Sequence, residues 1–198
     1  MWHKGIFAVL SLLVASSAPA ADLTKGQEAY DSGDYETALN EWRPLAEAGN
    51  ADAQFGIGLM YSNGFGVSMD DSEAVKWYLL AADQGHGMAQ NNLGVLYANG
   101  WGVPQSDEEA FKWYDMAANT GVVDAQRVLA DRYASGIGIG QNKAQAYKWL
   151  SIATELGDLD AQSARDELAA GMSAEDVAEG QSLANAWLQE RGKLVANQ

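Results

Sequence analysis

Few residues in this sequence are of the types that carry out catalysis or bind metal ions. The 198 residues include no cysteine and only two histidines, His3 and His86. A zinc site is built from a set of Cys and His ligands, and a lone histidine does not supply such a set. The sequence also has no G-x-S-x-G motif, the turn that presents a nucleophilic serine. We therefore predict no catalytic residue, no metal site and no cofactor.

Three short segments resemble ligand-binding motifs, but their context favours structural roles. Residues 136–140 alternate glycine with isoleucine, whereas a phosphate-binding loop follows a strand and this segment follows an expected helix. Residues 70–71 and 107–109 are acidic, but they lack the alternating oxygen ligands and the glycine of a calcium loop. We interpret them as caps at helix N-termini. His86 follows Gly85 at another expected helix start, so we predict a capping or solvent-exposed role for it.

These segments belong to an internal repeat with a period of 36 residues. The stretch from Ala89 to Gly121 shares most of its small, aromatic and glycine residues with the stretches 36 residues before and after it. The matching residues include Ala53, Gln54, Gly58, Tyr61, Gly64, Gly66, Ala74, Trp77, Tyr78 and Gly85 before it, and Ala125, Gln126, Tyr133, Gly136, Gly138, Ala146, Trp149 and Gly157 after it. A fixed period of this size is typical of stacked repeats, with one supersecondary unit per period.

Each period is expected to form two helices joined by a glycine turn. The first helices begin near residues 52, 87 and 123, and a glycine that can adopt the left-handed conformation follows each of them. Each second helix begins with a capping pattern, in which an acid or amide follows the cap residue by three positions. This pattern occurs at Asp70 and Glu73, at Ser106 and Glu109, and at Asn142 and Gln145. Apolar residues then recur at i, i+3, i+4, i+7 and i+8, which is one helix face.

Two residue types that recur in every repeat receive structural predictions. The tryptophans Trp77, Trp113 and Trp149 lie on the apolar stripe of the second helices, so we predict that they belong to the core rather than to a sugar-binding surface. The glutamines recur near the start of the first helices without an apolar role. We expect Gln54, Gln90, Gln126 and Gln162 to hydrogen-bond to a neighbouring turn.

The ends of the chain depart from the repeat. Residues 22–51 form a helix pair with a shorter turn, and residues 159–191 form a degenerate repeat and a final helix that reaches about Glu190. Atypical terminal units are expected because an open end of a stack exposes core. Residues 192–198 are expected to fray. We predict an all-α fold, a right-handed α-solenoid of about five stacked helix-turn-helix pairs with a capping C-terminal helix.

The pattern A-Q-x-x-L-G-x-x-Y-x-x-G-x-G-V, followed by A-x-x-W-Y-x-x-A-A-x-x-x-G, resembles the Sel1-like repeats, which are relatives of the tetratricopeptide repeats. Residues 52–158 hold three such repeats of 36 residues, and the pair at 22–51 resembles a tetratricopeptide repeat. The resemblance implies an exported bacterial protein that is not catalytic and that binds other proteins as an adaptor or regulator.

Residues 1–20 have the pattern of a cleaved secretory signal peptide. Lys4 precedes an apolar run from Ile6 to Ala15, which is too short to span a bilayer, and Ala18 to Ala20 suit a cleavage site. The alternative is an uncleaved anchor helix. We expect a mature chain without a membrane span, located in the periplasm or secreted.

The acidic composition restricts the partners of the protein. The net charge is −15, from 12 Lys and Arg residues against 27 Asp and Glu residues. Nucleic acids are bound through Lys and Arg contacts to phosphates, so the charge argues against a nucleic-acid partner, and likewise against an anionic membrane surface. Basic and neutral partners remain open, and the acidity also serves solubility.

Binding specificity is expected where the repeats differ, because the shared residues form the packing template. Phe55, Asn91 and Arg127 share one slot of the first helices, and Leu59, Val95 and Asp131 share another slot four residues on. Both slots lie on one helical face, which changes from apolar to charged along the concave groove that first helices line in solenoids. The alternative is that the apolar members pack on the preceding helix pair.

Trp101 is a further candidate because it lies at a loop tip, between Gly100 and Gly102. Phe65 and Ile137 occupy the same slot in the neighbouring repeats. The three apolar tips form either an exposed ladder along one edge or contacts with the adjacent turns.

Three functions fit these observations. The first is an exported, non-catalytic scaffold that binds a protein or peptide of the cell envelope in its concave groove. The second is attachment to peptidoglycan or another glycan, which requires exposed aromatic side chains on one face. The third is a cell-wall or β-lactam hydrolase, which requires a cluster of Ser and Lys or of Glu and His in a pocket. The relatives for which hydrolysis was proposed are rich in cysteine, and this chain has none.

Overall fold

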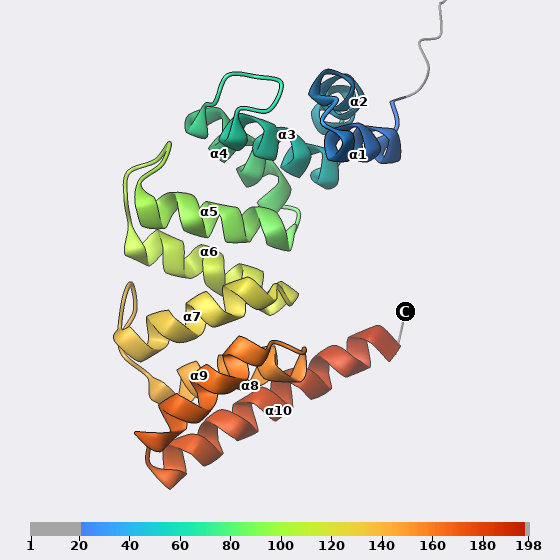
Figure 1. Cartoon of the computed structure of the whole chain (residues 1–198). Coiled ribbons are helices and arrows are strands. Elements are labelled where there is room, and N and C mark those ends of the chain that lie inside the picture. Colours follow the sequence, from blue (N-terminus) through green and yellow to red (C-terminus); the bar gives the residue numbers. More distant parts are fainter. Residues whose placement is uncertain (1–20, 197–198) are drawn as a thin grey trace, which may run out of the picture.

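The computed structural model describes residues 21–196, so the predicted signal peptide and residues 197–198 lie outside the described residues. Within residues 21–196 the chain forms ten α-helices and no strands (Figure 1). The helices are α1 (Leu23–Ser32), α2 (Tyr35–Glu47), α3 (Ala51–Asn63), α4 (Asp71–Ala82), α5 (Gly87–Asn99), α6 (Asp107–Thr120), α7 (Val123–Ser135), α8 (Lys143–Glu155), α9 (Leu159–Ala170) and α10 (Ala174–Ala196). The all-α prediction is confirmed.

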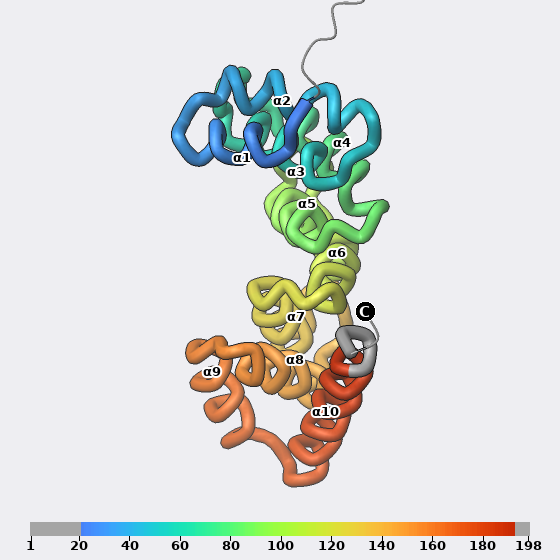
Figure 2. Tube along the Cα trace, turned by 90° about the vertical axis from the view of Figure 1, so that its right-hand side faces the viewer, coloured from blue at the N-terminus to red at the C-terminus, as the bar shows by residue number. Residues whose placement is uncertain are grey.

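From α1 to α9 each helix packs against the next one in the chain, α10 packs along α8, and the helix pairs stack into an open crescent (Figure 1). Figure 2, turned by 90°, shows α5, α7 and α9 along one side of the stack and α6 and α10 along the other. The predicted α-solenoid is therefore confirmed. The surface formed by α3, α5, α7 and α9 is called the first-helix face below.

The second helices begin at the predicted caps. The side chain of Asp70 accepts a hydrogen bond from the backbone N–H of Glu73 at 3.0 Å, and Ser106 accepts one from Glu109 at 3.2 Å. The acid of the pattern serves a different partner, because the Glu109 carboxylate pairs with Lys112 at 2.7 Å. Each cap satisfies an N–H group that the helix itself leaves without a partner.

The recurring glutamines join each unit to the one before it. The side-chain amide nitrogens of Gln54, Gln90 and Gln126 donate to the carbonyl oxygens of Ala46, Ala82 and Ala118 at 3.0, 3.1 and 3.2 Å. Those carbonyls belong to the last turn of the preceding second helix, where helices leave acceptors free. The predicted hydrogen bond to a neighbouring turn is confirmed for these three. The fourth, Gln162, is exposed on α9.

The tryptophans of the second helices pack into the core as predicted. Trp149 is fully buried, and Trp77 and Trp113 are partly buried against the core clusters. Tyr78 is also buried, and Gly58 on α3 makes room for its ring. A side chain at Gly58 would place its Cβ 2.5 Å from the Tyr78 ring, so the small residue sets the distance between α3 and α4.

The C-terminal helix takes a path that the sequence did not predict. Helix α10 continues through Ala196, past the expected end at Glu190, and it packs along α8 rather than against α9. Gly180 allows this approach, since a Cβ there would lie 2.7 Å from the carbonyl oxygen of Ala144 on α8. The indole of Trp187 lies 6.0 Å from that of Trp149 in an edge-to-face arrangement. Helix α10 therefore covers the core at α8, and α9 keeps an exposed outer side.

The glycine loop of each repeat lies against the start of the preceding second helix. Gly102 has a φ of +68°, and a Cβ there would lie 2.5 Å from the carbonyl oxygen of Asp71. Two features of this position therefore favour glycine, the left-handed backbone conformation and the close contact with another backbone segment. Gly85 has only the first, with a φ of +84° and open space, and Gly140 has neither.

We predict that Gly102→Ala lowers the free energy of unfolding by about 2–3 kcal/mol, because it adds a steric clash to the cost of the left-handed conformation. Gly85→Ala is expected to cost about 1–2 kcal/mol, and Gly140→Ala less than about 0.5 kcal/mol. Urea denaturation of the three variants tests this order. Equal losses for Gly102→Ala and Gly85→Ala would contradict the inferred backbone contact.

Candidate functional site

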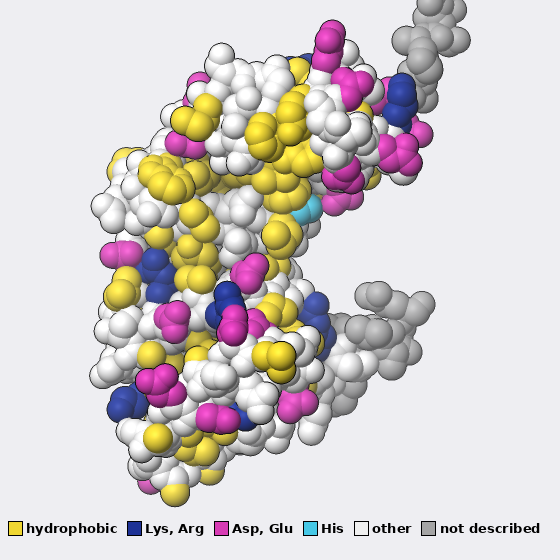
Figure 3. Space-filling model, viewed as in Figure 1, with side chains coloured by type: hydrophobic (Ala, Val, Ile, Leu, Met, Phe, Trp, Pro, Cys, Tyr) yellow, Lys and Arg dark blue, Asp and Glu magenta, His cyan; other side chains and the backbone are white. Residues whose placement is uncertain are grey.

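The first-helix face changes in character along the stack. In Figure 3, hydrophobic side chains gather over α3 and α5, and charged side chains over α7 and α9. This order follows the slots that vary between repeats. Phe55 and Leu59 lie on α3, Asn91 and Val95 on α5, and Arg127 and Asp131 on α7.

A hollow of about 200 Å³ lies between α3 and α5, and it is called the Trp101 hollow below. It is lined by Leu59, Ser62, Asn63, Tyr78, Asn92, Val95, Leu96 and Trp101. Three of the predicted binding residues, Leu59, Val95 and Trp101, therefore come together in one place. Two residues of the helix-face slots and one loop tip, which were separate candidates in the sequence, thus meet at one hollow.

The loop tips differ in how they pack. Phe65 stacks on Tyr35 with ring centroids 4.6 Å apart, so it fills the contact with the preceding turn. Trp101 is 51% exposed and Ile137 is 47% exposed. The structure thus combines the two alternatives, because one tip packs on the adjacent turn while the other two remain accessible. Of the two, Trp101 lines the hollow.

Tyr78 forms the inner end of the Trp101 hollow. Burial raises the pKa of Tyr78 to about 12, although hydrogen bonding of its hydroxyl with the Asn92 and Ser62 side chains opposes part of this rise. The lining of the hollow therefore combines two aromatic side chains, two amides and a serine hydroxyl with aliphatic side chains. This mixture suits recognition of a side chain that has both apolar and polar parts.

Phe55 lies at a second hollow, of about 440 Å³, beside the start of α1. Its ring stacks on His86 with centroids 4.6 Å apart. The Nδ1 atom of His86 accepts a hydrogen bond from the backbone N–H of Ala89 at 3.2 Å, so the predicted capping role is confirmed. Its Nε2 atom lies 3.4 Å from an Asp52 carboxylate oxygen. Asn91, which shares the slot of Phe55, is partly buried.

The charged members of the two slots have separate surroundings. Arg127 lies 3.5 Å from a carboxylate oxygen of Asp158 and 3.3 Å from one of Asp160, so it joins α7 to the start of α9. Asp131 is exposed and lines a hollow of about 400 Å³ between α7 and α9, together with Glu167. Although Asp131 is exposed, the surrounding protein removes part of the water around its carboxylate and raises its pKa, and Arg127 opposes this rise.

Neither a metal centre nor a membrane helix is found in the described part of the chain. Residues 21–196 contain no group of three or more His, Cys, Asp or Glu residues placed to hold a metal ion. None of their helices is long and apolar enough to cross a membrane.

The helix pairs, their glycine loops and the glutamine contacts define an α-solenoid of a particular repeat class. The Sel1 repeat family matches residues 51–86, 87–122 and 123–158, which are more than half of the chain. These matches coincide with the pairs α3–α4, α5–α6 and α7–α8. The chain belongs to the Sel1 repeat family, whose members generally act as scaffolds for protein interactions.

Solved structures of the family share the fold. A Sel1 repeat protein from Oxalobacter formigenes is 35% identical with a TM-score of 0.71, and the match covers 73% of this chain and 59% of that one. The protein c5321, a protective antigen present in uropathogenic Escherichia coli strains, is 32% identical with a TM-score of 0.62, covering 71% and 34%. This chain thus spans less than two thirds of either protein.

A more distant structure supports the fold alone. Cysteine-rich protein B of Helicobacter pylori is 22% identical with a TM-score of 0.53, and the match covers 66% of this chain and 93% of that one. The chain matches no curated protein sequence.

Two residues that line the Trp101 hollow, Tyr78 and Leu96, were not predicted as binding residues from the sequence. Tyr78 lies on the predicted apolar stripe of its helix, so no binding role was predicted for it, and none was predicted for Leu96. A signal was present, since Leu96 corresponds to Arg132 in the next repeat. A change from leucine to arginine at an otherwise apolar position marks a difference in the local packing.

The alkaline stability of the protein tests the burial of Tyr78. The unfolded tyrosine loses its proton near pH 10 and the folded one near pH 12, so stability is unaffected below about pH 10 and falls between about pH 10 and 12. We predict that, between about pH 10 and 12, the free energy of unfolding falls by about 2 kcal/mol less in Tyr78→Phe than in the wild type. Urea denaturation of both proteins across this range measures it. Parallel pH profiles would contradict the burial of the hydroxyl.

Proposed function

We propose that this protein is an exported, non-catalytic scaffold that binds a protein or peptide partner on the first-helix face, as an adaptor or regulator in the cell envelope. The observation that carries the proposal is the Trp101 hollow, where residues that vary between repeats meet a half-exposed indole. Membership of the Sel1 repeat family supports it, because such repeats generally mediate protein interactions.

The polar residues of the hollows support a binding role over a catalytic one. The Trp101 hollow has Ser62, Asn63 and Asn92 as its small polar side chains, and its lining includes no His, Lys or Glu that would act as a base. The Nδ1 atom of His86 is already used as a helix cap. Partner contacts are proposed for Leu59, Val95 and Trp101 first, with Phe55, Asn91, Arg127 and Asp131 extending the surface along the face.

Export is proposed from the leader pattern of residues 1–20, and it places the mature chain in the periplasm or outside the cell. A glycan partner such as peptidoglycan is the second candidate. Trp101 beside the amides of Asn63 and Asn92 offers the aromatic and hydrogen-bonding groups that bind sugars.

The test compares two exposed loop tips that occupy the same repeat slot. Trp101→Ala is expected to lose the partner retained by the wild type, with little change in Tm, because the indole is half exposed. Ile137→Ala, at a tip that is 47% exposed, is expected to retain it. The measurement is affinity capture from the native envelope with quantitative identification of the retained proteins, alongside sedimentation with purified peptidoglycan.

Equal retention of proteins by both variants would contradict the proposed site. Cosedimentation with peptidoglycan that depends on Trp101, without any captured protein, would favour the glycan candidate.

A further inference from the structure

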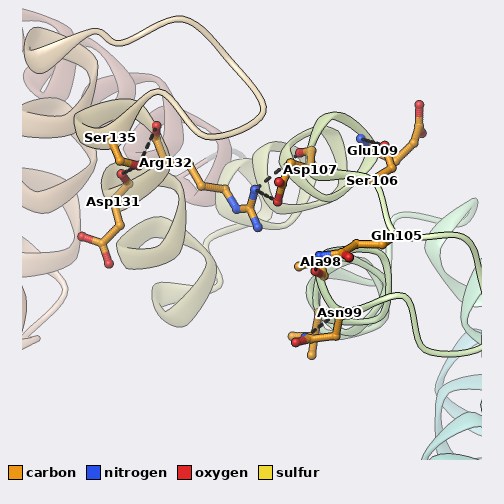
Figure 4. A network of polar contacts seen from close by, with 10 residues as sticks. Ala98, Asn99, Gln105, Ser106, Asp107, Glu109, Asp131, Arg132 and Ser135 are labelled. Atoms are coloured by element: carbon orange, nitrogen blue, oxygen red, sulfur yellow. Dashed lines mark hydrogen bonds and ion pairs between the residues drawn. The ribbon is translucent and has the colours of Figure 1, made fainter.

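One repeat interface shows what fills the position of the Trp101 hollow elsewhere in the stack. Between α7 and the pair α5–α6, the guanidinium of Arg132 on α7 lies 3.1 Å from a carboxylate oxygen of Asp107 on α6, as Figure 4 shows. The same guanidinium lies over the ring of Tyr114, 5.2 Å from its centroid. Its side chain is only 11% exposed. An arginine held between a carboxylate and an aromatic face therefore occupies this interface.

The interface between α3 and α5 keeps the receiving groups and lacks the arginine. Positions 36 residues earlier hold Asp71 for Asp107 and Tyr78 for Tyr114, whereas Leu96 takes the place of Arg132. Leucine is shorter than arginine and carries no charge. The space next to it is the Trp101 hollow, of about 200 Å³.

The backbone around the two acids is also equivalent. Asp71 contacts the glycine loop of the following repeat at Gly102, as Asp107 does at Gly138. Asp71 also lies near enough to Tyr78 to add to the rise in its pKa, after burial as the main cause. The acid and the aromatic ring therefore belong to one local environment in both interfaces.

The interface between α7 and α9 shows that these groups are not retained everywhere. The positions of Asp107 and Tyr114 are taken there by Lys143 and Leu150. A hollow is present at this interface, but it has neither the aromatic ring nor the acid at the equivalent positions. The Trp101 hollow is lined by Tyr78, and Asp71 lies near that tyrosine without lining the hollow itself.

We propose that the Trp101 hollow is a receptor for an arginine side chain of the protein partner, which takes the position that Arg132 occupies between α5 and α7. This inference rests on the proposed function, and it specifies the partner. Asp71 supplies the counter-charge from beside the hollow, and the half-exposed Trp101 provides the aromatic surface for the guanidinium, with the buried Tyr78 beneath it. The net charge of −15 favours the approach of a basic partner.

The test uses the pentapeptide acetyl-Gly-Gly-Arg-Gly-Gly-amide and two matched peptides, with citrulline or lysine in place of arginine. Citrulline keeps the shape of arginine and removes its charge. The peptides are titrated into ¹⁵N-labelled protein while the indole N–H signal of Trp101 and the amide signal of Asp71 are followed by NMR. We expect saturable shifts with the arginine peptide, and at least ten-fold weaker binding of the citrulline and lysine peptides.

Leu96→Arg is the decisive variant, because it places the chain's own arginine in the hollow. We expect it to remain folded, with a Tm at or above that of the wild type, and to lose the shifts caused by the arginine peptide. Asp71→Asn provides an independent test should Leu96→Arg fail to fold, and it is expected to weaken binding at least ten-fold.

Three outcomes would overturn the inference: no saturable shift with the arginine peptide, equal binding of the citrulline peptide, or unchanged binding by a folded Leu96→Arg variant. If these occur while Trp101→Ala still loses a captured protein, the scaffold function stands and the partner binds through another group. If the arginine peptide binds but Trp101→Ala and wild type capture the same proteins, the scaffold proposal fails and the hollow remains an arginine site without a role in that capture.

Discussion

The side-chain amide of Gln90 donates a hydrogen bond to the carbonyl oxygen of Ala82, and the same contact recurs at Gln54 and Gln126. Each of these glutamines is buried at the start of a first helix, and each satisfies an acceptor at the end of the preceding second helix. A buried amide without a partner is costly, so the contact restricts how one unit can slide on the next. The positions of the loops and hollows follow from this fixed spacing.

The glycine loops make the second contact between units, and they determine where side chains meet across an interface. Because Gly102 touches the backbone of Asp71, the loop tip with Trp101 is held beside α3 and α5. The same geometry places Arg132 against Asp107 one unit further on. Equivalent interfaces therefore share one arrangement, and the exchange of Arg132 for Leu96 is one of the differences between the filled interface and the one with the hollow.

The proposed binding surface is local rather than spread evenly along the face. Leu59 and Val95 line the Trp101 hollow, whereas Arg127 is held by the carboxylates of Asp158 and Asp160 at the start of α9. Variation between repeats thus has two different structural consequences. At one interface it leaves an accessible site, and at another it provides the ion pairs that join the last repeat to the helix that follows it.

The sequence by itself determined the repeat, the helix pairs, the caps and the glutamine contacts, because each depends on residues close in the chain or on a period of 36 residues. It did not determine the path of α10. That path depends on the fit of Gly180 against Ala144 on α8, a contact between distant residues. Nor did it show that Leu59, Val95 and Trp101 share one hollow with Tyr78. Only the packing of α3 and α5 on α4 brings these side chains together, because the space between them depends on side-chain sizes in two adjacent units.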